Sequence, residues 1–142
     1  MSEFARFMKE NKKVRENTKY AVTESLVDEN GNPIKWELRP LTTSEVEVLR
    51  DSCTREVPVP GKKGSTKTKF NGKEYSLKLI TASIVCPNLN DQELQDSYDV
   101  NCAEDLVTAM VDNPGEYDRL GSFILEFNGF KTFDEEVEEA KN

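Results

Sequence analysis

Hydrophobic and polar positions alternate in the first third of the chain and follow helical spacing in the second half. Within residues 19–40, two groups of apolar residues lie at even-numbered positions: Tyr20, Val22 and Leu26, then Ile34, Trp36 and Leu38. Period-two alternation is typical of a strand with one buried face. The pattern predicts an antiparallel β-hairpin whose turn lies in the polar run between the two groups.

The turn of this hairpin decides which residues face each other. A two-residue Asn30-Gly31 turn would place the two apolar groups on opposite faces of the sheet. An odd turn from Glu29 to Gly31, with Gly31 at positive φ, keeps them on one face, so we favour it. The predicted cross-strand pairs are Leu26 with Ile34 and Val22 with Leu38.

A helix start follows the hairpin, and we predict a helix over residues 42–54. Thr42 is the expected N-cap and Glu45 its capping-box partner, while Leu41 and Val46 have the spacing of a hydrophobic staple. One face of this helix is expected to carry Val46, Leu49 and Cys53.

Residues 55–72 are rich in glycine and proline, which interrupt regular structure. Positions 61–73 hold five lysines and no acidic residue. We predict a mobile basic loop here. The functional alternative is a basic edge that meets an acidic partner or the acidic tail of another copy.

Residues 73–142 are predicted to be helical. The run from Lys73 to Cys86 is apolar nearly all round, which indicates a central helix buried on more than one side, and Pro87 ends it. Cap residues three positions before a glutamate predict four further helix starts: Asn90 with Glu93, Asn101 with Glu104, Asn113 with Glu116 and Thr132 with Glu135. Pro114 suits a first helical position and Gly129 suits a helix end.

The fold class expected from these elements is α+β in a single domain over residues 1–142. An N-terminal antiparallel β-hairpin, or a small sheet containing it, packs on a C-terminal array of short α-helices. A length of 142 residues is ordinary for one domain.

Two groups of apolar side chains are candidates for contact with a partner. In residues 2–17, Phe4, Phe7 and Met8 have the spacing of one face of a short amphipathic helix. So short a helix needs a docking surface on its own domain, on another copy or on a partner. The second candidate is the aromatic face of Tyr117, Phe123 and Phe127. For both groups, ordinary core packing is the alternative.

The charge balance narrows the class of partner. The chain has 27 acidic and 19 basic residues and a net charge of −8. Nucleic acids and anionic membrane surfaces attract proteins with cationic fields, so we expect neither as a partner. The acidic balance favours a basic or amphipathic protein partner. With no apolar run long enough to span a membrane and no signal-peptide pattern, a cytoplasmic location is expected.

Catalytic chemistry is not indicated. The chain contains no histidine, which removes the usual general base and the commonest metal ligand. The three cysteines, Cys53, Cys86 and Cys102, are far apart and lack metal-binding spacing, so each is expected to be a small buried apolar group. We therefore expect no catalytic residues, no cofactor and no bound metal.

Several segments, in order along the chain, resemble the XkdN-like family of phage tail assembly chaperones from PBSX-type prophages. Residues 87–98 read Pro-Asn-Leu-Asn-Asp-Gln-Glu-Leu-Gln-Asp-Ser-Tyr, similar to the family signature that follows its apolar helix. Residues 28–39 resemble its hairpin. Shorter likenesses fall at positions 52–54, 114–117, 128–130 and at the Glu-Glu-Ala-Lys-Asn ending, whereas residues 56–71 show none.

This resemblance implies a non-catalytic chaperone that binds the phage tape measure protein and keeps it in solution while the tail tube assembles. It implies a cytoplasmic protein that is not retained in the mature virion, with self-association and the tail tube protein as further contacts. The alternative hypothesis is a structural subunit of the tail or its connector.

Overall fold

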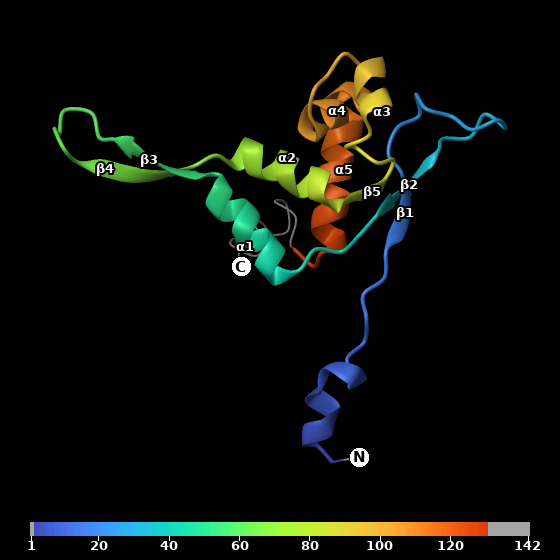
Figure 1. The fold of residues 1–142 in the computed structure, drawn as a ribbon, viewed down its shortest axis with the longest axis horizontal. Coiled ribbons are helices and arrows are strands. Elements are labelled where there is room, and N and C mark those ends of the chain that lie inside the picture. Colours follow the sequence, from blue (N-terminus) through green and yellow to red (C-terminus); the bar gives the residue numbers. More distant parts are fainter. Residues whose placement is uncertain (1, 131–142) are drawn as a thin grey trace, which may run out of the picture.

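The computed structural model describes residues 2–130, and it consists of a central body with projecting hairpins and an N-terminal arm (Figure 1). Three strands form one sheet in the order β1-β2-β5: β1 (Thr18–Ala21), β2 (Lys35–Leu38) and β5 (Ile84–Cys86). A separate two-stranded sheet contains β3 (Thr54–Pro58) and β4 (Thr66–Phe70). The helices are α1 (Thr43–Ser52), α2 (Gly72–Ser83), α3 (Gln92–Ser97), α4 (Ala103–Met110) and α5 (Pro114–Phe127). The predicted α+β class is confirmed.

The turn of the first hairpin has the predicted odd length. The Ile34 N–H donates to the Leu26 carbonyl at 2.9 Å, so these residues lie opposite each other as expected. Gly31 has φ +81°, a left-handed conformation that glycine adopts without a steric penalty. Asp28 stabilises the turn by accepting from the N–H groups of Asn30 and Asn32.

Farther along the hairpin, the predicted pairing of Val22 with Leu38 is wrong. Leu38 pairs with Thr18, because the register shifts by four residues between the Ala21–Lys35 pair and the Val27–Pro33 bridge, where a turn at Glu24 and Ser25 interrupts the ladder. This interruption contains an even number of residues, so it preserves side-chain parity. Tyr20 therefore lies directly opposite Trp36, and the apolar groups still share one face.

The predicted start of α1 is confirmed in detail. Thr42 Oγ1 accepts from the Glu45 N–H at 3.2 Å, and Glu45 Oε1 accepts from the Thr42 N–H at 3.1 Å. Leu41 and Val46 are both buried and belong to one cluster, as a hydrophobic staple requires. The capping box fixes where α1 begins and therefore how it lies against α2.

Replacing the N-cap should test this start. We expect Thr42→Ala to lower the free energy of unfolding by about 1 kcal/mol, since an N–H at the first turn loses its acceptor. Urea unfolding followed by circular dichroism measures the change. The exposed neighbour Thr43, substituted in the same way, is the matched control and should change stability by less than about 0.5 kcal/mol. Equal losses in the two variants would contradict a capping role for Thr42.

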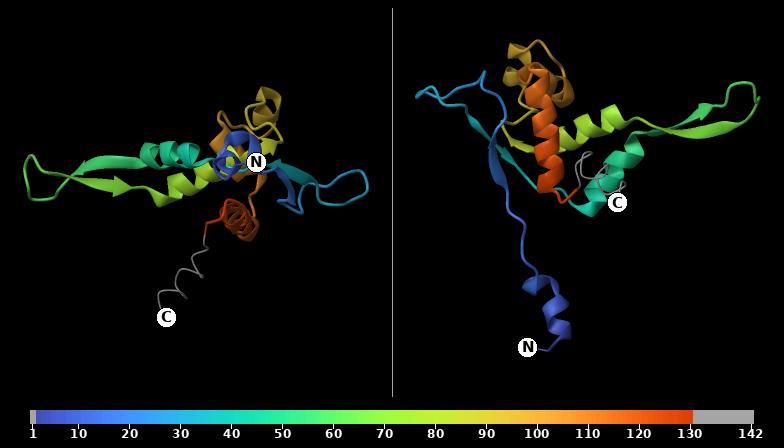
Figure 2. Two further views of the ribbon diagram at one scale, coloured as in Figure 1. Left: turned by 90° about the horizontal axis from the view of Figure 1, so that it is seen from below. Right: turned by 180° about the vertical axis from the view of Figure 1, so that it is seen from behind.

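The prediction of an irregular loop over residues 55–72 is wrong. β3 and β4 pair without interruption from Thr54 opposite Phe70 to Pro58 opposite Thr66, and only residues 59–65 form the turn. The glycines and prolines that suggested a loop lie at the end of β3, in the turn and, for Gly72, at the start of α2. Figure 2 shows this hairpin extending from the body in the direction opposite to the turn of the first hairpin.

The central helix is present but shorter than predicted. α2 ends at Ser83, and the last residues of the apolar run, Ile84 to Cys86, form β5 against β2. The Arg39 N–H also donates to the Ser83 carbonyl at 2.8 Å. An apolar run satisfies a buried helix and a buried strand equally, and the open edge of β2 selects the strand for its last three residues.

The predicted caps of the later helices are right in one case and wrong in two. Asn113 caps α5 with Pro114 as the first residue, as predicted. The cap of α3 is Asp91 rather than Asn90, because a turn closed by Asn88 holds Asn90 and moves the helix start by one residue.

The start of α4 also differs. Its N-cap position is Cys102, whose side chain makes no capping bond, rather than Asn101. The end of α3 causes the shift: Asp99 has φ 56°, and the Val100 N–H returns to the Gln95 carbonyl. This closure sets the direction in which the chain enters α4.

The end of α5 is confirmed. Gly129 has φ +80°, and the Phe130 N–H donates to the Leu125 carbonyl at 2.8 Å, which is the pattern of a Schellman motif. The helix predicted from the Thr132 and Glu135 pair lies outside the described residues.

The main core lies between the three-stranded sheet and helices α2, α4 and α5. The side chains that are most deeply buried there are Trp36, Leu38, Ile80, Leu106, Val107, Leu120 and Ile124. A second, smaller cluster joins α1 to α2 through Leu41, Val46 and Leu79. Both clusters include a residue of α2, so the central position predicted for this helix is confirmed.

Candidate partner-binding surfaces

The N-terminal segment presents apolar side chains to solvent. Residues 2–17 do not form the predicted amphipathic helix; they contain two short 3-10 turns, η1 (Phe4–Phe7) and η2 (Lys9–Asn11), with no buried residue. Phe4 and Phe7 are 76% and 81% exposed, and Met8 is 44% exposed. An isolated segment of this length lacks the packing that would stabilise an α-helix.

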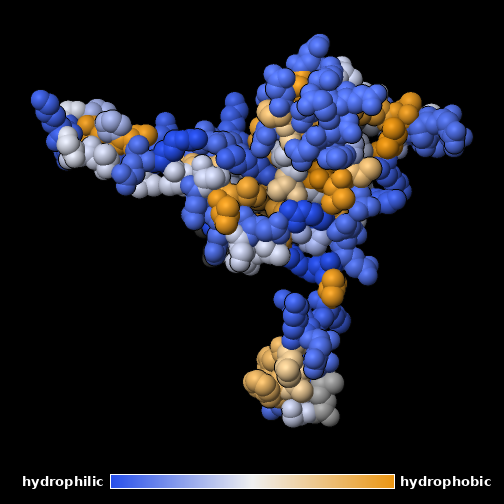
Figure 3. All heavy atoms as spheres, in the orientation of Figure 1, coloured by the Kyte–Doolittle hydropathy of each residue, from blue (hydrophilic) through white to orange (hydrophobic). Residues whose placement is uncertain are grey.

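Two polar contacts attach this N-terminal arm to the body. Arg15 donates to the Leu41 carbonyl at 2.6 Å, and Asn17 donates to the Glu37 carboxylate at 2.9 Å. Beyond them the arm projects freely, and hydrophobic atoms gather near its end (Figure 3). Exposed phenylalanine at the end of an arm is the arrangement expected of an anchor that inserts into another molecule.

The second predicted group, on α5, is partly covered by its own domain. Phe123 stacks on Tyr20 of β1 with ring centroids 4.2 Å apart, and Phe127 stacks on Phe123 at 6.2 Å. Tyr117 packs against the main core, and burial raises the pKa of its hydroxyl. The structure thus places Tyr117 and Phe123 within the packing of the domain and leaves Phe127 half-buried at the outer end of the stack.

A contact between distant residues positions this face, and the sequence pattern did not reveal it. Glu116 was expected to complete a capping box with Asn113, but its carboxylate accepts from Thr23 Oγ1 at 2.7 Å and from the Glu24 N–H at 2.8 Å. These bonds hold the pKa of Glu116 below its ordinary value. They attach the turn after β1 to the start of α5, which brings Tyr20 over Phe123.

A shallow groove between α1 and α2 is a third apolar surface, which was not predicted from the sequence. It has a volume of about 360 Å³ and is lined by Ser44, Glu45, Val48, Leu49 and Ala82. Val48 is 68% exposed at its edge. The sequence does contain a signal for this groove. Val48 lies directly beside the stripe of Val46, Leu49 and Cys53, so the apolar face of α1 is wider than packing on α2 requires.

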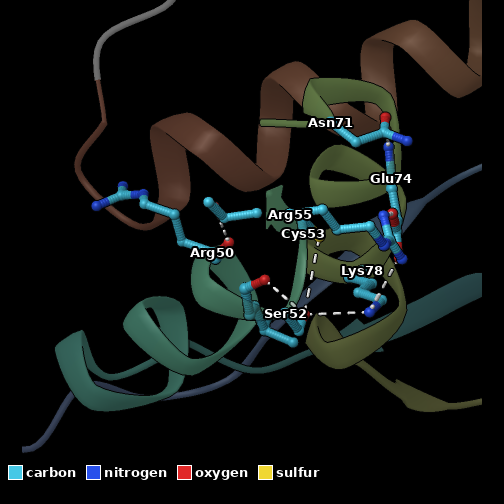
Figure 4. A network of polar contacts seen from close by, with 9 residues as sticks. Arg50, Ser52, Cys53, Arg55, Asn71, Glu74 and Lys78 are labelled. Carbon is cyan, nitrogen blue, oxygen red and sulfur yellow. Dashed lines mark hydrogen bonds and ion pairs between the residues drawn. The ribbon is translucent and has the colours of Figure 1, made fainter. Parts of the chain in front are cut away.

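A polar network fixes the base of the β3–β4 hairpin (Figure 4). Glu74 of α2 accepts from Arg55 of β3 at 3.0 Å and pairs with Lys78 at 3.3 Å, and Lys78 donates to Ser52 at 3.1 Å. The guanidinium of Arg55 is the main reason why the pKa of Glu74 lies below its usual range. The negative charge of Glu74 is balanced by the two neighbouring cations. The network therefore anchors the base of the hairpin, and its charged groups are already paired with one another.

Comparison with known proteins assigns the chain to a family. The family model described as "Phage XkdN-like tail assembly chaperone protein, TAC" matches residues 4–141. The chain belongs to the XkdN-like family of phage tail assembly chaperones. The resemblance read from the sequence is therefore confirmed, and the partners of this family are proteins of the phage tail.

Two relatives in Bacillus subtilis (strain 168) match most of this family member's length. It is 27% identical to the phage-like element PBSX protein XkdN over 128 residues, which cover 89% of this chain and 85% of XkdN. It is 24% identical to protein YqbN over 125 residues, covering 88% and 83% of the two chains. The crystal structure of YqbN has the same fold, with a TM-score of 0.74 at 17% identity, over 92% of this chain and 99% of YqbN.

XkdN-like chaperones as a family are generally non-enzymatic. Residues 2–130 hold no group of three or more cysteine, aspartate or glutamate side chains that could bind a metal ion. None of the described helices is long and apolar enough to cross a membrane.

The cysteine prediction is right for one residue and wrong for two. Cys53 is buried, but Cys86 and Cys102 are exposed. Cys86 lies on β5, an edge strand of the three-stranded sheet, and Cys102 occupies the N-cap position of α4.

The ion pair beside the α1–α2 groove should make stability depend on pH. Arg39 donates to Glu45 at 2.6 Å, and this bond is the main reason why the pKa of Glu45 is lowered from 4.5 to about 2. A carboxylate with a lowered pKa stabilises the fold above its unfolded-state pKa and loses that contribution as the pH falls toward the folded-state value. More than a third of each side chain is exposed, so we expect a contribution of at most about 1 kcal/mol.

The test compares Glu45→Gln with the wild type by urea unfolding across this window. The difference in unfolding free energy between the wild type and Glu45→Gln should have its largest value at about pH 6. It should shrink as the pH falls from about 4.5 to about 2. The exposed Glu47, changed to Gln, serves as the control and should show no such dependence. A difference that stays constant through the window would contradict this account of the pair.

Proposed function

We propose that this tail assembly chaperone binds the tape measure protein and keeps it in solution during tail assembly, with the N-terminal arm as the first contact. The arm supports the proposal because Phe4 and Phe7 are more than three-quarters exposed and belong to neither core cluster of the described residues. A long helical tape measure chain presents apolar faces, and phenylalanine anchors suit grooves between such helices. The acidic balance of the chain would keep the complex soluble.

The aromatic row on α5 is the second proposed contact. Phe127 is its accessible member and stacks on Phe123, while Tyr117 and Phe123 pack against the main core. On this proposal the chaperone contributes binding alone, acts in the host cytoplasm and leaves before the virion is complete. Contact with the tail tube protein and self-association are secondary proposals that follow from the same assembly role.

The experiment is co-expression of the chain with the tape measure protein, followed by measurement of the soluble tape measure fraction. Phe4→Asp with Phe7→Asp should reduce affinity at least about 100-fold, since burying each phenylalanine contributes on the order of 2 kcal/mol. The free energy of unfolding should stay within about 0.5 kcal/mol of the wild type, because neither ring packs in the fold. Loss of solubilisation without loss of stability would thus separate binding from folding.

A matched control changes an exposed apolar residue elsewhere on the surface. Val27 is 49% exposed in the turn of the first hairpin, and Val27→Asp should leave solubilisation unchanged. If the wild-type chain does not raise the solubility of the tape measure protein, the proposed function is wrong. If the chain is a stoichiometric component of purified tails, it is a structural subunit of the tail or connector instead.

A further inference from the structure

A groove of about 520 Å³ lies where three distant parts of the chain meet. The base of the N-terminal arm, helix α1 with the residues just before it, and the end of α5 form its walls. Leu41 and Val46 contribute apolar surface to it, and Phe130, the last residue that the structure describes, lies on its rim. Chain that continues past Phe130 therefore starts at the groove itself.

The groove carries positive charge on a protein that is acidic overall. Lys12, Arg15 and Arg50 line it together with a single acid, Glu47, which leaves a net charge of 3 − 1 = +2. Among residues 2–130, none of these three cations forms an ion pair; Arg15 donates to a backbone carbonyl, and Arg50 lies over the Tyr75 ring at 5.6 Å. Three cations in a groove that also holds some apolar surface suit an acidic, amphipathic segment.

The last twelve residues of the chain have this chemistry. Residues 131–142 contain five acids and two lysines, a net charge of 2 − 5 = −3, and their apolar residues Phe133 and Val137 are four positions apart. The first acid, Asp134, follows Phe130 by four residues, so it can reach at most about 14 Å from the rim. We propose that residues 131–142 bind in this groove of their own chain, with the acids against Lys12, Arg15 and Arg50.

Such binding would couple the two ends of the chain. The N-terminal arm is attached to the body by two polar contacts at Arg15 and Asn17. A tail that pairs with Lys12 and Arg15 adds contacts at the base of the arm and restrains the direction in which the arm projects.

Paramagnetic broadening in the full-length chain tests the proposal. A nitroxide is attached at Asn142→Cys in a chain that carries Cys86→Ser and Cys102→Ser and retains the buried Cys53. We expect selective broadening of the Thr42 and Val46 amide signals and none in β4. Lys12→Glu with Arg50→Glu should lower the groove-bound population about tenfold, because two attractive pairs become repulsive.

Two controls make the result specific. Lys62→Glu with Lys63→Glu reverses two cations in the turn of the β3–β4 hairpin and should leave the broadening unchanged. Glu135→Lys with Glu138→Lys, added to the groove reversal, should restore it. Absence of broadening at Thr42 and Val46, persistence after the groove reversal, or failure of the restoring variant would overturn the proposal. A mixture of isotope-labelled chains without the nitroxide and unlabelled chains that carry it reports contacts between copies. Broadening that appears only in this mixture would also overturn the proposal, since the contact would then join different copies.

Discussion

Replacing Trp36 with alanine is expected to cost about 4 kcal/mol of unfolding free energy, since removal of a buried tryptophan leaves a large cavity. Trp36 is 2% exposed and lies on β2, opposite Tyr20 of β1. Its side chain belongs to the main core between the sheet and the helices. A loss of this size is comparable with the whole stability of a marginal domain. We therefore expect Trp36→Ala to be largely unfolded at 37 °C, as measured by circular dichroism and urea unfolding.

The adjacent position on the same strand supplies the control. Lys35 is exposed and lies opposite Ala21, so Lys35→Ala should change stability by less than about 0.5 kcal/mol. A conservative variant, Trp36→Phe, should retain much of the stability because it keeps an aromatic ring in the core. If Trp36→Ala unfolds at the same urea concentration as Lys35→Ala, the arrangement of the core described above is wrong.

The parts of this fold that the sequence predicted correctly depend on residues close together in the chain. The capping box of Thr42 with Glu45, the Asn113 cap before Pro114 and the left-handed Gly31 each satisfy backbone groups within a few residues. Side-chain parity also predicted that the apolar residues of the first hairpin share a face, because parity survives an interruption of even length.

The parts that were missed depend on distant partners. The three residues of β5 belong to an apolar run that is helical until Ser83, and only pairing with β2 makes them a strand. β3 and β4 lack apolar alternation, since β4 reads Thr-Lys-Thr-Lys-Phe and is exposed throughout. Their strand character comes from pairing with each other and from the anchor of Arg55 on Glu74, which no local pattern contains.

The same distinction applies to the predicted contact residues. Spacing selected apolar side chains correctly, but it does not tell whether the fold covers them. The N-terminal arm leaves Phe4 and Phe7 exposed, whereas the bonds from Glu116 to Thr23 and Glu24 draw β1 over α5 and cover Phe123. These bonds span more than ninety positions in the chain, so local spacing could not reveal them.

The aromatic row allows the structural and binding roles of α5 to be separated by two substitutions. Phe123→Ala is expected to lower the unfolding free energy by about 2 kcal/mol, roughly half the cost of a fully buried phenylalanine, because its half-buried ring loses both stacking partners. Phe127→Ala loses one stacking contact at the outer end of the row, so we expect less than about 1 kcal/mol. Urea unfolding of both variants measures these costs.

Binding should follow the reverse order if Phe127 is the accessible member of the second contact. At a temperature where both variants are folded, Phe127→Ala should weaken binding to the tape measure protein about tenfold, as loss of one partly buried ring predicts. Phe123→Ala should weaken it less, since its ring is covered by Tyr20. Equal binding by Phe127→Ala and the wild type would remove α5 from the contact and leave the N-terminal arm as the anchor.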